Sequence, residues 1–292
     1  MGDINIEISE FKPAPSDYKC APSKKFEDGS CINLKMLIQM AKAYNENYPS
    51  NKIKLSTNIE TLNPKKYKQY LLKEFQKRLK NVCENQSCWV KQNFVQKMNK
   101  NMLDDLTRNT YRPKGPDGQF TWLNTVNIQE VMEQYEKKYN DFIFLGALPI
   151  DFDNLPQLGV RDLDFADLIK KGKTKVGAVF NLDKHNEPGS HWVSVYIDLL
   201  KKQIYFFDSY AKKPEARIRK FMRRAARFLQ EYYKEEPEVD YNRVRLQFKG
   251  SECGMFSLFF IIMMLQGKSF QDVSSSKVYD EEVNKLRQVF FT

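Results

Sequence analysis

An apolar run from Met255 to Leu265 sets the strongest limit on how this chain folds. The run is well short of the roughly 20 apolar residues that cross a bilayer, so the rest of the protein has to cover it. Cys253 lies just before the run, and the pattern predicts a buried helix that begins at Cys253 and extends to about Leu265. A chain of 292 residues is long enough to build a core around such a helix.

The second half of the sequence mixes strand and helix patterns. Segments rich in β-branched and aromatic residues predict strands at 176–181, 191–198, 203–208 and 244–248. A long helix is expected between the last two strands, because apolar residues recur there at helical spacing. Its expected inward residues are Ile218, Phe221, Met222, Ala225, Leu229 and Tyr232. Asn127 and Glu130 predict a capping box for an earlier helix. Strands and helices segregated in this way are typical of an α+β domain.

The first half is rich in lysine and predicts a separate helical region. Residues 1–30 contain three prolines and are expected to form an extended arm. Asn33 and Asn63 are candidate caps of two helices, and a third amphipathic helix is expected over 89–103. The segment 112–118 is rich in residues that favour turns, and it predicts a linker. The expected organisation is therefore an arm at 1–30, a helical accessory region at 31–115 and a main domain at 116–292.

Cysteine usage indicates the redox environment. The chain has five cysteines, at positions 20, 31, 83, 88 and 253, and no signal peptide is expected at its start. An odd number of cysteines without a secretion signal predicts mostly free thiols in a reducing compartment. The spacing of Cys83 and Cys88 does not fit a common zinc knuckle, and the chain has only two histidines, His185 and His191, so no metal site is expected.

One histidine begins a predicted β-hairpin. If Leu199 to Lys202 form a four-residue loop, Asp198 pairs with Gln203, and His191 and Asp208 then project from the same face, one pairing step apart. A carboxylate at that distance can accept the imidazole N–H and stabilise the charged ring. A register slip of one residue would move Asp208 to the other face of the sheet.

Cys253 is predicted to lie where a strand gives way to a helix. The unpaired N–H groups and the positive end of the helix dipole favour thiolate over thiol there. Gly254 allows close approach of a substrate backbone, and Gln247 is a candidate to hold an oxyanion together with the Cys253 N–H. Each residue taken alone has a plainer explanation, as a buried small residue, a structural histidine or a common glutamine.

Together these residues resemble a known family. His191-Trp192, an Asp after an intervening hairpin, and Gln-x5-Cys-Gly opening a helix are similar to the ubiquitin-like-protein (SUMO) protease and adenovirus proteinase group of cysteine peptidases. Trp122-Leu123-Asn124 resembles the segment that begins the catalytic domain of SUMO proteases. The resemblance implies a papain-type catalytic domain at 116–292, with Cys253 as nucleophile, His191 as base, Asp208 as its partner and Gln247 as oxyanion donor.

The same resemblance implies a substrate preference. Trp122 and Trp192 would roof a narrow tunnel that admits only glycine, because two facing indoles exclude any Cβ atom. Cleavage would then follow a Gly-Gly sequence. The helical N-terminal region, the segment 121–128 and the pattern Gly146-x2-Pro149-x-Asp-Phe152 resemble the proteases of large cytoplasmic DNA viruses, in particular asfarviruses. That likeness implies processing of viral structural polyproteins during virion maturation, in the virus factory of the host cytoplasm and in the virion. Asp208 departs from it, since the asfarvirus enzyme has Asn at the third catalytic position.

Three other functions use the same features. The first is an isopeptidase that removes ubiquitin or SUMO from host proteins by identical chemistry. The second is an acetyltransferase on the same scaffold, which the Trp122/Trp192 pair disfavours because acetyl transfer has no use for a glycine tunnel. The third is a catalytically idle nucleic-acid-binding protein that uses the arginine-rich helix.

The net charge of +10 favours acidic partners. Arg219, Arg223 and Arg224 are the expected nucleic-acid contacts, with DNA as an activator like that of adenovirus proteinase. No other cofactor and no membrane span are expected.

Overall fold

The computed structural model describes residues 18–57 and 62–292. The chain divides into two compact units. Among the described residues, the sheet unit comprises Gly115–Arg287, and the helical unit comprises 18–57, 62–114 and Gln288–Thr292. Most of the arm predicted at 1–30 lies outside the described residues.

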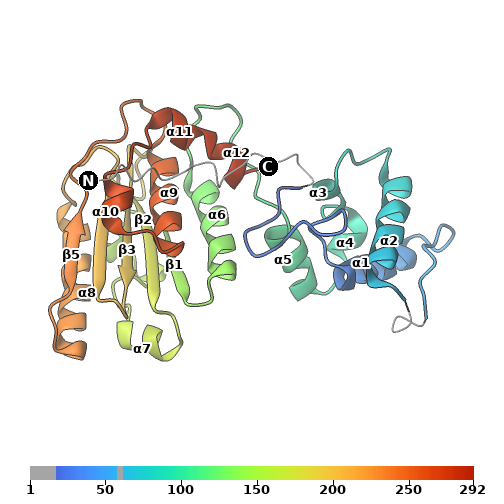
Figure 1. Ribbon diagram of the computed structural model, residues 1–292, viewed down its shortest axis with the longest axis horizontal. Coiled ribbons are helices and arrows are strands. Elements are labelled where there is room, and N and C mark those ends of the chain that lie inside the picture. The colour runs from blue at the N-terminus through green and yellow to red at the C-terminus, as the bar shows by residue number, and fades with distance from the viewer. Residues whose placement is uncertain (1–17, 58–61) are drawn as a thin grey trace. The chain divides into compact units, whose positions relative to one another are not determined.

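The sheet unit is built on a mixed five-stranded sheet, which confirms the α+β prediction (Figure 1). The strand order is β1-β2-β3-β4-β5, with β1 parallel to β2, β4 parallel to β5, and the other two pairs antiparallel. The strands are β1 (Phe142–Pro149), β2 (Lys175–Asn181), β3 (Trp192–Asp198), β4 (Gln203–Phe207) and β5 (Glu238–Tyr241).

Helices cover both faces of this sheet (Figure 1). Alternate side chains of β2, β3 and β4 pack with α7 (Phe165–Lys170) and α8 (Ala216–Tyr233) in one core. The opposite face packs against α9 (Cys253–Leu265) and α6 (Thr125–Lys138). Every residue of α9 is buried, which explains why it is apolar on all sides and confirms the helix predicted from Cys253 to Leu265.

Short helices complete this half of the chain. They are η3 (Phe152–Asn154), η4 (Pro156–Leu158), α10 (Phe270–Ser274), α11 (Asp280–Lys285) and α12 (Arg287–Phe290). Nowhere in 18–57 or 62–292 does a helix have both the length and the continuous apolarity that crossing a bilayer requires.

Three sequence predictions for the sheet unit are wrong. The segment 244–248 is not a strand, because its N–H groups bond instead to the Ser209 carbonyl and the Asp280 carboxylate. The fifth strand is β5, a few residues earlier. The capping box of α6 joins Asn124 and Asn127, three residues before the predicted pair. Tyr232 on α8 is half exposed rather than inward, although the other five predicted inward residues are buried.

The helical unit has its own core. Its helices are α1 (Leu34–Asn47), α2 (Pro64–Leu79), α3 (Gln86–Trp89), α4 (Asn93–Gln96) and α5 (Lys100–Asn109). Asn33 and Asn63 cap α1 and α2 with their side chains, as predicted. The single helix predicted over 89–103 is wrong, since that stretch is divided among α3, α4 and α5.

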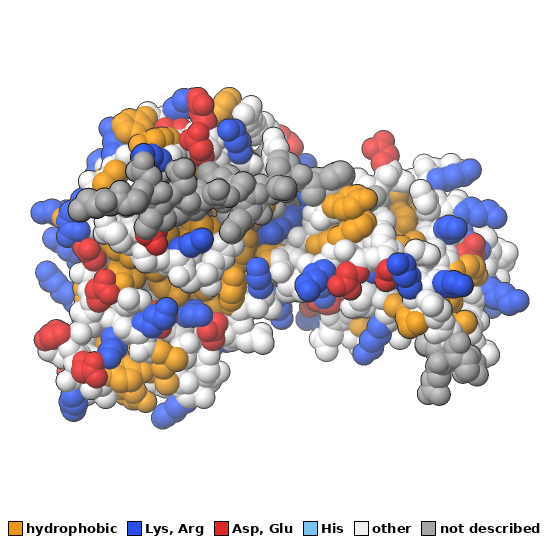
Figure 2. All heavy atoms as spheres, viewed as in Figure 1, with side chains coloured by type: hydrophobic (Ala, Val, Ile, Leu, Met, Phe, Trp, Pro, Cys, Tyr) orange, Lys and Arg blue, Asp and Glu red, His pale blue; other side chains and the backbone are white. Residues whose placement is uncertain are grey.

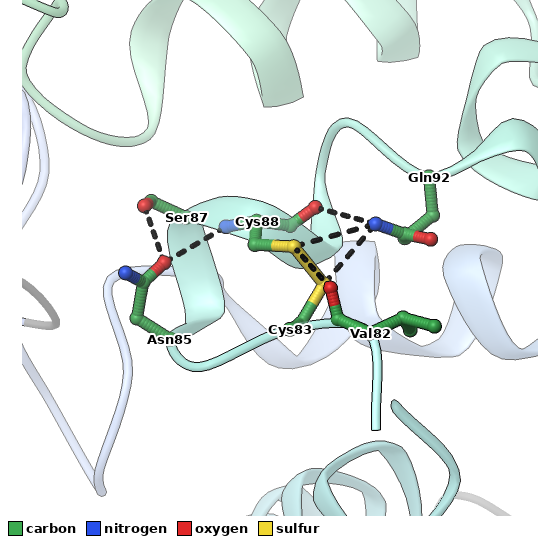
Figure 3. The surroundings of a disulfide bond; sticks show 6 residues. All are labelled: Val82, Cys83, Asn85, Ser87, Cys88 and Gln92. Carbon is green, nitrogen blue, oxygen red and sulfur yellow. Dashed lines mark hydrogen bonds between the residues drawn. A yellow bond between two sulfur atoms is a disulfide. The ribbon is translucent and has the colours of Figure 1, made fainter. Parts of the chain in front are cut away.

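The helical unit also contains two disulfide bonds, Cys20–Cys31 and Cys83–Cys88. The prediction of mostly free thiols is therefore wrong: of the five cysteines, Cys253 alone is free. The turns after α2 bring Cys83 and Cys88 to a Cα separation of 5.5 Å, within the range that a disulfide requires. In Figure 3 the Gln92 amide lies against this bond, with Nε2 3.1 Å from the Cys83 sulfur and 3.4 Å from the Cys88 sulfur.

Candidate active site

The β3–β4 hairpin has the predicted register. Asp198 pairs with Gln203 and Ser194 with Phe207, so the four-residue loop is confirmed. The register brings the residue before β3 next to the residue after β4, and His191 Nε2 donates to Asp208 Oδ1 at 2.7 Å. Both side chains are buried, and the contact is thus shielded from water.

Four further contacts hold Asp208 and His191 in place. The Asp208 carboxylate also accepts the Tyr210 N–H at 2.8 Å, and the Tyr210 ring stacks on His191 with centroids 4.6 Å apart. Asn242 accepts the Asp208 N–H at 2.9 Å and donates to the Asp208 carbonyl at 2.7 Å. Sequence reasoning gave no role to Tyr210, and it missed Asn242, whose only signal was its position just after β5.

Cys253 is the first residue of α9 and is buried. The preceding Glu252 makes no side-chain capping bond, so no side chain of that residue competes for the N–H groups of the first turn. Burial lowers the pKa of His191, but hydrogen bonds to Asp208 and Cys253 outweigh it and raise that pKa from 6.5 to about 9. Because Nε2 is bound to Asp208, Nδ1 is the ring nitrogen left for the Cys253 thiol. The arrangement suits a proton shared between sulfur and imidazole.

Gln247 is fully buried, and its side-chain amide contacts Ser209 and Tyr210, the two residues that follow Asp208. Its Oε1 accepts the Ser209 hydroxyl at 2.6 Å, and its Nε2 donates to the Lys249 carbonyl at 2.7 Å. The second Nε2 contact, to the Tyr210 hydroxyl, is longer at 3.3 Å. An oxyanion would have to replace this longer contact, and the role of Gln247 as an oxyanion donor stays a prediction.

Both predicted indoles line one groove of about 370 Å³. The other residues along it come from the start of α6, the end of β1, the end of β2 and the loop between β2 and β3. Trp122 is 46% exposed, whereas Trp192 is 5% exposed and donates its Nε1–H to the Leu123 carbonyl at 2.8 Å. One indole is therefore fixed and the other is free to meet a ligand.

Gly254 is needed for packing. A Cβ atom at this position would lie 2.9 Å from the Cβ of Leu123, closer than real contacts allow. Leu123 is also the acceptor of the Trp192 indole, so the start of α9 and the groove wall share one buried neighbour. The contact of Gly254 with a substrate backbone stays a prediction.

Sequence reasoning also missed a histidine–carboxylate pair, His185 and Asp151, and the residue that precedes the thiol. His185 lines the groove, and its Nδ1 lies 2.6 Å from Oδ2 of the buried Asp151, whose Oδ1 accepts the His185 N–H. Burial raises the pKa of Asp151, but these bonds prevail and lower it overall. The available signals were that His185 is one of two histidines and that Asp151 lies in the Gly146–Phe152 pattern.

Glu252, which directly precedes the thiol, was missed as well. Its buried carboxylate accepts from Asn284 at 2.8 Å and from Ser251 at 2.7 Å, and it pairs with Arg287 at 3.3 Å. The turn that presents Cys253 is therefore fixed to the C-terminal part of the sheet unit.

The predicted nucleic-acid contacts differ among themselves. Arg219 and Arg223 are exposed on α8. The Arg224 guanidinium instead donates to the carbonyls of Val160 and Arg161 and lies over the rings of Phe165 and Phe221. Burial lowers the pKa of Arg224. Elsewhere Lys and Arg side chains are spread over the visible face among Asp and Glu (Figure 2).

Known proteins identify the family. A family model described as the Ulp1 protease family, C-terminal catalytic domain, matches residues 175–291. A protein of Acanthamoeba polyphaga mimivirus named as a thiol protease is 33% identical over 279 residues, which cover 93% of this chain and 92% of that protein.

African swine fever virus supplies a second relative. Its cysteine protease is 25% identical over 261 residues, covering 83% of this chain and 95% of the relative. The same protein from another isolate is named a SUMO-1 cysteine protease. A crystal structure of this viral protease has the same fold, with a TM-score of 0.63 at 23% identity over 81% of this chain and 93% of that one. The chain belongs to the Ulp1 family of cysteine proteases.

Proposed function

We propose that this protease cleaves after Gly-Gly sequences and processes viral structural polyproteins, with Cys253, His191 and Asp208 as its catalytic triad. The observation that carries the proposal is the buried position of His191, whose Nε2 donates to Asp208 at 2.7 Å and whose pKa both Asp208 and Cys253 raise. The two indoles line one groove: Trp192 begins β3 directly after His191, and Trp122 lies just before α6.

The proposed reaction begins with transfer of the Cys253 proton to His191 Nδ1. The thiolate attacks the carbonyl carbon of the substrate glycine, and the electron pair of the C=O bond moves onto oxygen. The Cys253 N–H, with Gln247 as second donor, stabilises this oxyanion, and one such donor typically lowers the barrier by about 3 kcal/mol. When the intermediate collapses, the C–N bond breaks and His191 gives its proton to the leaving amine.

A thioester between Cys253 and the substrate remains. His191 then removes a proton from water, the hydroxide oxygen adds to the thioester carbonyl, and the C–S bond breaks to release the acid and the free enzyme. The Asp208 side chain accepts the His191 Nε2–H and stabilises the imidazolium that forms in each half of the reaction. No step in this sequence needs a metal or an organic cofactor.

The proposed substrate preference follows from the groove. Trp192 is held by its bond to the Leu123 carbonyl, and the exposed Trp122 forms the other wall. An extended Gly-Gly backbone fits between two indoles where a side chain does not. Both viral relatives are proteases, which favours a viral protein as substrate, and we place the enzyme in virus factories and virions.

One specific observation favours a second function. The African swine fever virus relative carries the name SUMO-1 cysteine protease in some isolates. Removal of a ubiquitin-like protein also ends at Gly-Gly and would use the same triad and groove, so substrate, not mechanism, separates the two functions.

The test is co-expression of the protease with a candidate structural polyprotein, followed by N-terminal sequencing of the products. We expect new N-termini directly after Gly-Gly with the wild type and none with Cys253→Ala. A parallel assay on SUMO and ubiquitin fused to a reporter amine measures deconjugation. Faster turnover of those fusions than of the polyprotein would replace polyprotein processing with deconjugation. Cleavage by Cys253→Ala at the wild-type rate would remove the catalytic proposal altogether.

A further inference from the structure

A second cavity lies on the face of the sheet unit opposite Cys253. This α8 pocket has a volume of about 610 Å³, within the range of small-molecule sites. Helix α8 forms one side, and the segments 152–154 and 160–161 form the other. Its lining residues are Phe152, Asp153, Asn154, Val160, Arg161, Arg217, Lys220, Phe221, Arg223, Arg224 and Arg227. Its lining shares no residue with the groove that Trp122 and Trp192 line.

The pocket has far more positive than negative charge. Six lysine and arginine side chains line it against one carboxylate, Asp153. That carboxylate is already paired with Arg217 at 2.5 Å. Across the described parts of the chain, the side chains of Lys220, Arg223 and Arg227 form no ion pair or hydrogen bond. Like charges gathered in one concavity repel each other, and an anion would relieve that repulsion.

Arg224 provides a second, independent observation that points to a ligand in this pocket. Its terminal nitrogens donate to the Val160 and Arg161 carbonyls, and these bonds fix the guanidinium in the pocket wall. Its Nε is buried and has no hydrogen-bond partner within the described chain. A buried donor without a partner is costly, and a shift of the guanidinium toward the pocket would let a ligand acceptor satisfy it.

The shape and the donor types together indicate the class of ligand. Arginine forks match the geometry of phosphate oxygens, and several of them around one concavity suit an anion with more than one charge. Arg219, on the same helix but outside the pocket, is not part of this convergence. We propose that the α8 pocket binds a compact polyphosphate anion, either an inorganic polyphosphate or the phosphate chain of a nucleotide.

Titration calorimetry and thermal unfolding of the full chain test this proposal, with inorganic tripolyphosphate as the first probe. We expect saturable binding, a Tm that rises with ligand concentration and an affinity that falls with salt. Replacing Arg223 and Arg227 together with alanine should weaken binding at least tenfold. Arg219→Ala is the matched control and should leave the dissociation constant unchanged. Both positions of the double variant are exposed, and its Tm without ligand checks that it folds.

Two further ligands show which phosphate compound binds and whether binding is only a nonspecific electrostatic attraction. ATP binding more tightly than tripolyphosphate would identify a nucleotide, and equal affinity would identify the phosphate chain itself. A 20-base-pair DNA duplex serves as the macromolecular competitor. The proposal is overturned if tripolyphosphate does not bind, if the double variant binds as the wild type does, or if Arg219→Ala weakens binding as much as the double variant. Tighter binding of the duplex than of tripolyphosphate, with equal dependence on all three arginines, would also overturn it.

Discussion

Replacing Asp208 with asparagine changes the charge beside His191 while keeping an oxygen that can accept its Nε2–H. A hydrogen bond to a charged group contributes about 1.5–3 kcal/mol. Since about 1.4 kcal/mol corresponds to one pKa unit, the pKa of His191 should fall from about 9 by about one to two units. His191 must be protonated to give its proton to the leaving amine. The alkaline limb of kcat/KM should therefore move from about pH 9 toward neutral pH by the same amount.

The assay measures kcat/KM for a Gly-Gly-X peptide between pH 6 and pH 10. Asp240→Asn is the matched control, because that carboxylate pairs with Arg243 at the surface and has no contact with His191. The control should keep the wild-type limb, and Asp208→Ala should lose more activity than Asp208→Asn because it also removes the acceptor. If Asp208→Asn kept its alkaline limb at the wild-type pH, Asp208 would not be what stabilises the imidazolium.

Three further predictions concern stability. Gly254→Ala forces a Cβ atom into its packed neighbour and should cost about 1–3 kcal/mol in urea unfolding, whereas Gly250→Ala, with open space around its Cβ, should cost much less; equal costs would refute the packing argument. Replacing Cys83 and Cys88 with serine should cost about 2 kcal/mol, and no change relative to the oxidised wild type would mean that the bond does not constrain the unfolded chain. The folded-state pKa of His191 is raised to about 9 from 6.5, so its stabilising contribution is complete below pH 6.5 and lost as pH rises through 9. His191→Gln should remove this part of the pH dependence, and an unchanged stability profile would contradict it.

Local patterns predicted the parts of the fold that local physics decides. The apolar run from Cys253 required a buried helix, and the caps at Asn33 and Asn63 fixed two helix starts. The length of the loop after Asp198 determined the hairpin register. Each of these rests on residues close in sequence, and each is confirmed.

The features that sequence reasoning could not predict depend on hydrogen-bond partners far apart in the sequence. The segment 244–248 has the composition of a strand, but its N–H groups find the Ser209 carbonyl and the Asp280 carboxylate. The bond between His185 and Asp151 spans 34 positions, and no periodicity indicates it. The prediction of free thiols was wrong for another reason. It was inferred from the expected reducing compartment, which says nothing of how closely turns bring two cysteines together.

Covalent trapping tests the central claim most directly. A peptide ending in Gly-Gly with a thiol-reactive vinyl sulfone in place of the scissile bond should label one residue, identified by peptide mass spectrometry. We expect the label on Cys253, with a rate that falls at least tenfold in His191→Ala and is unchanged in the surface variant Asp240→Asn. A label on another residue, or an equal rate of Cys253 labelling in the wild type and in His191→Ala, would contradict a cysteine activated by that imidazole.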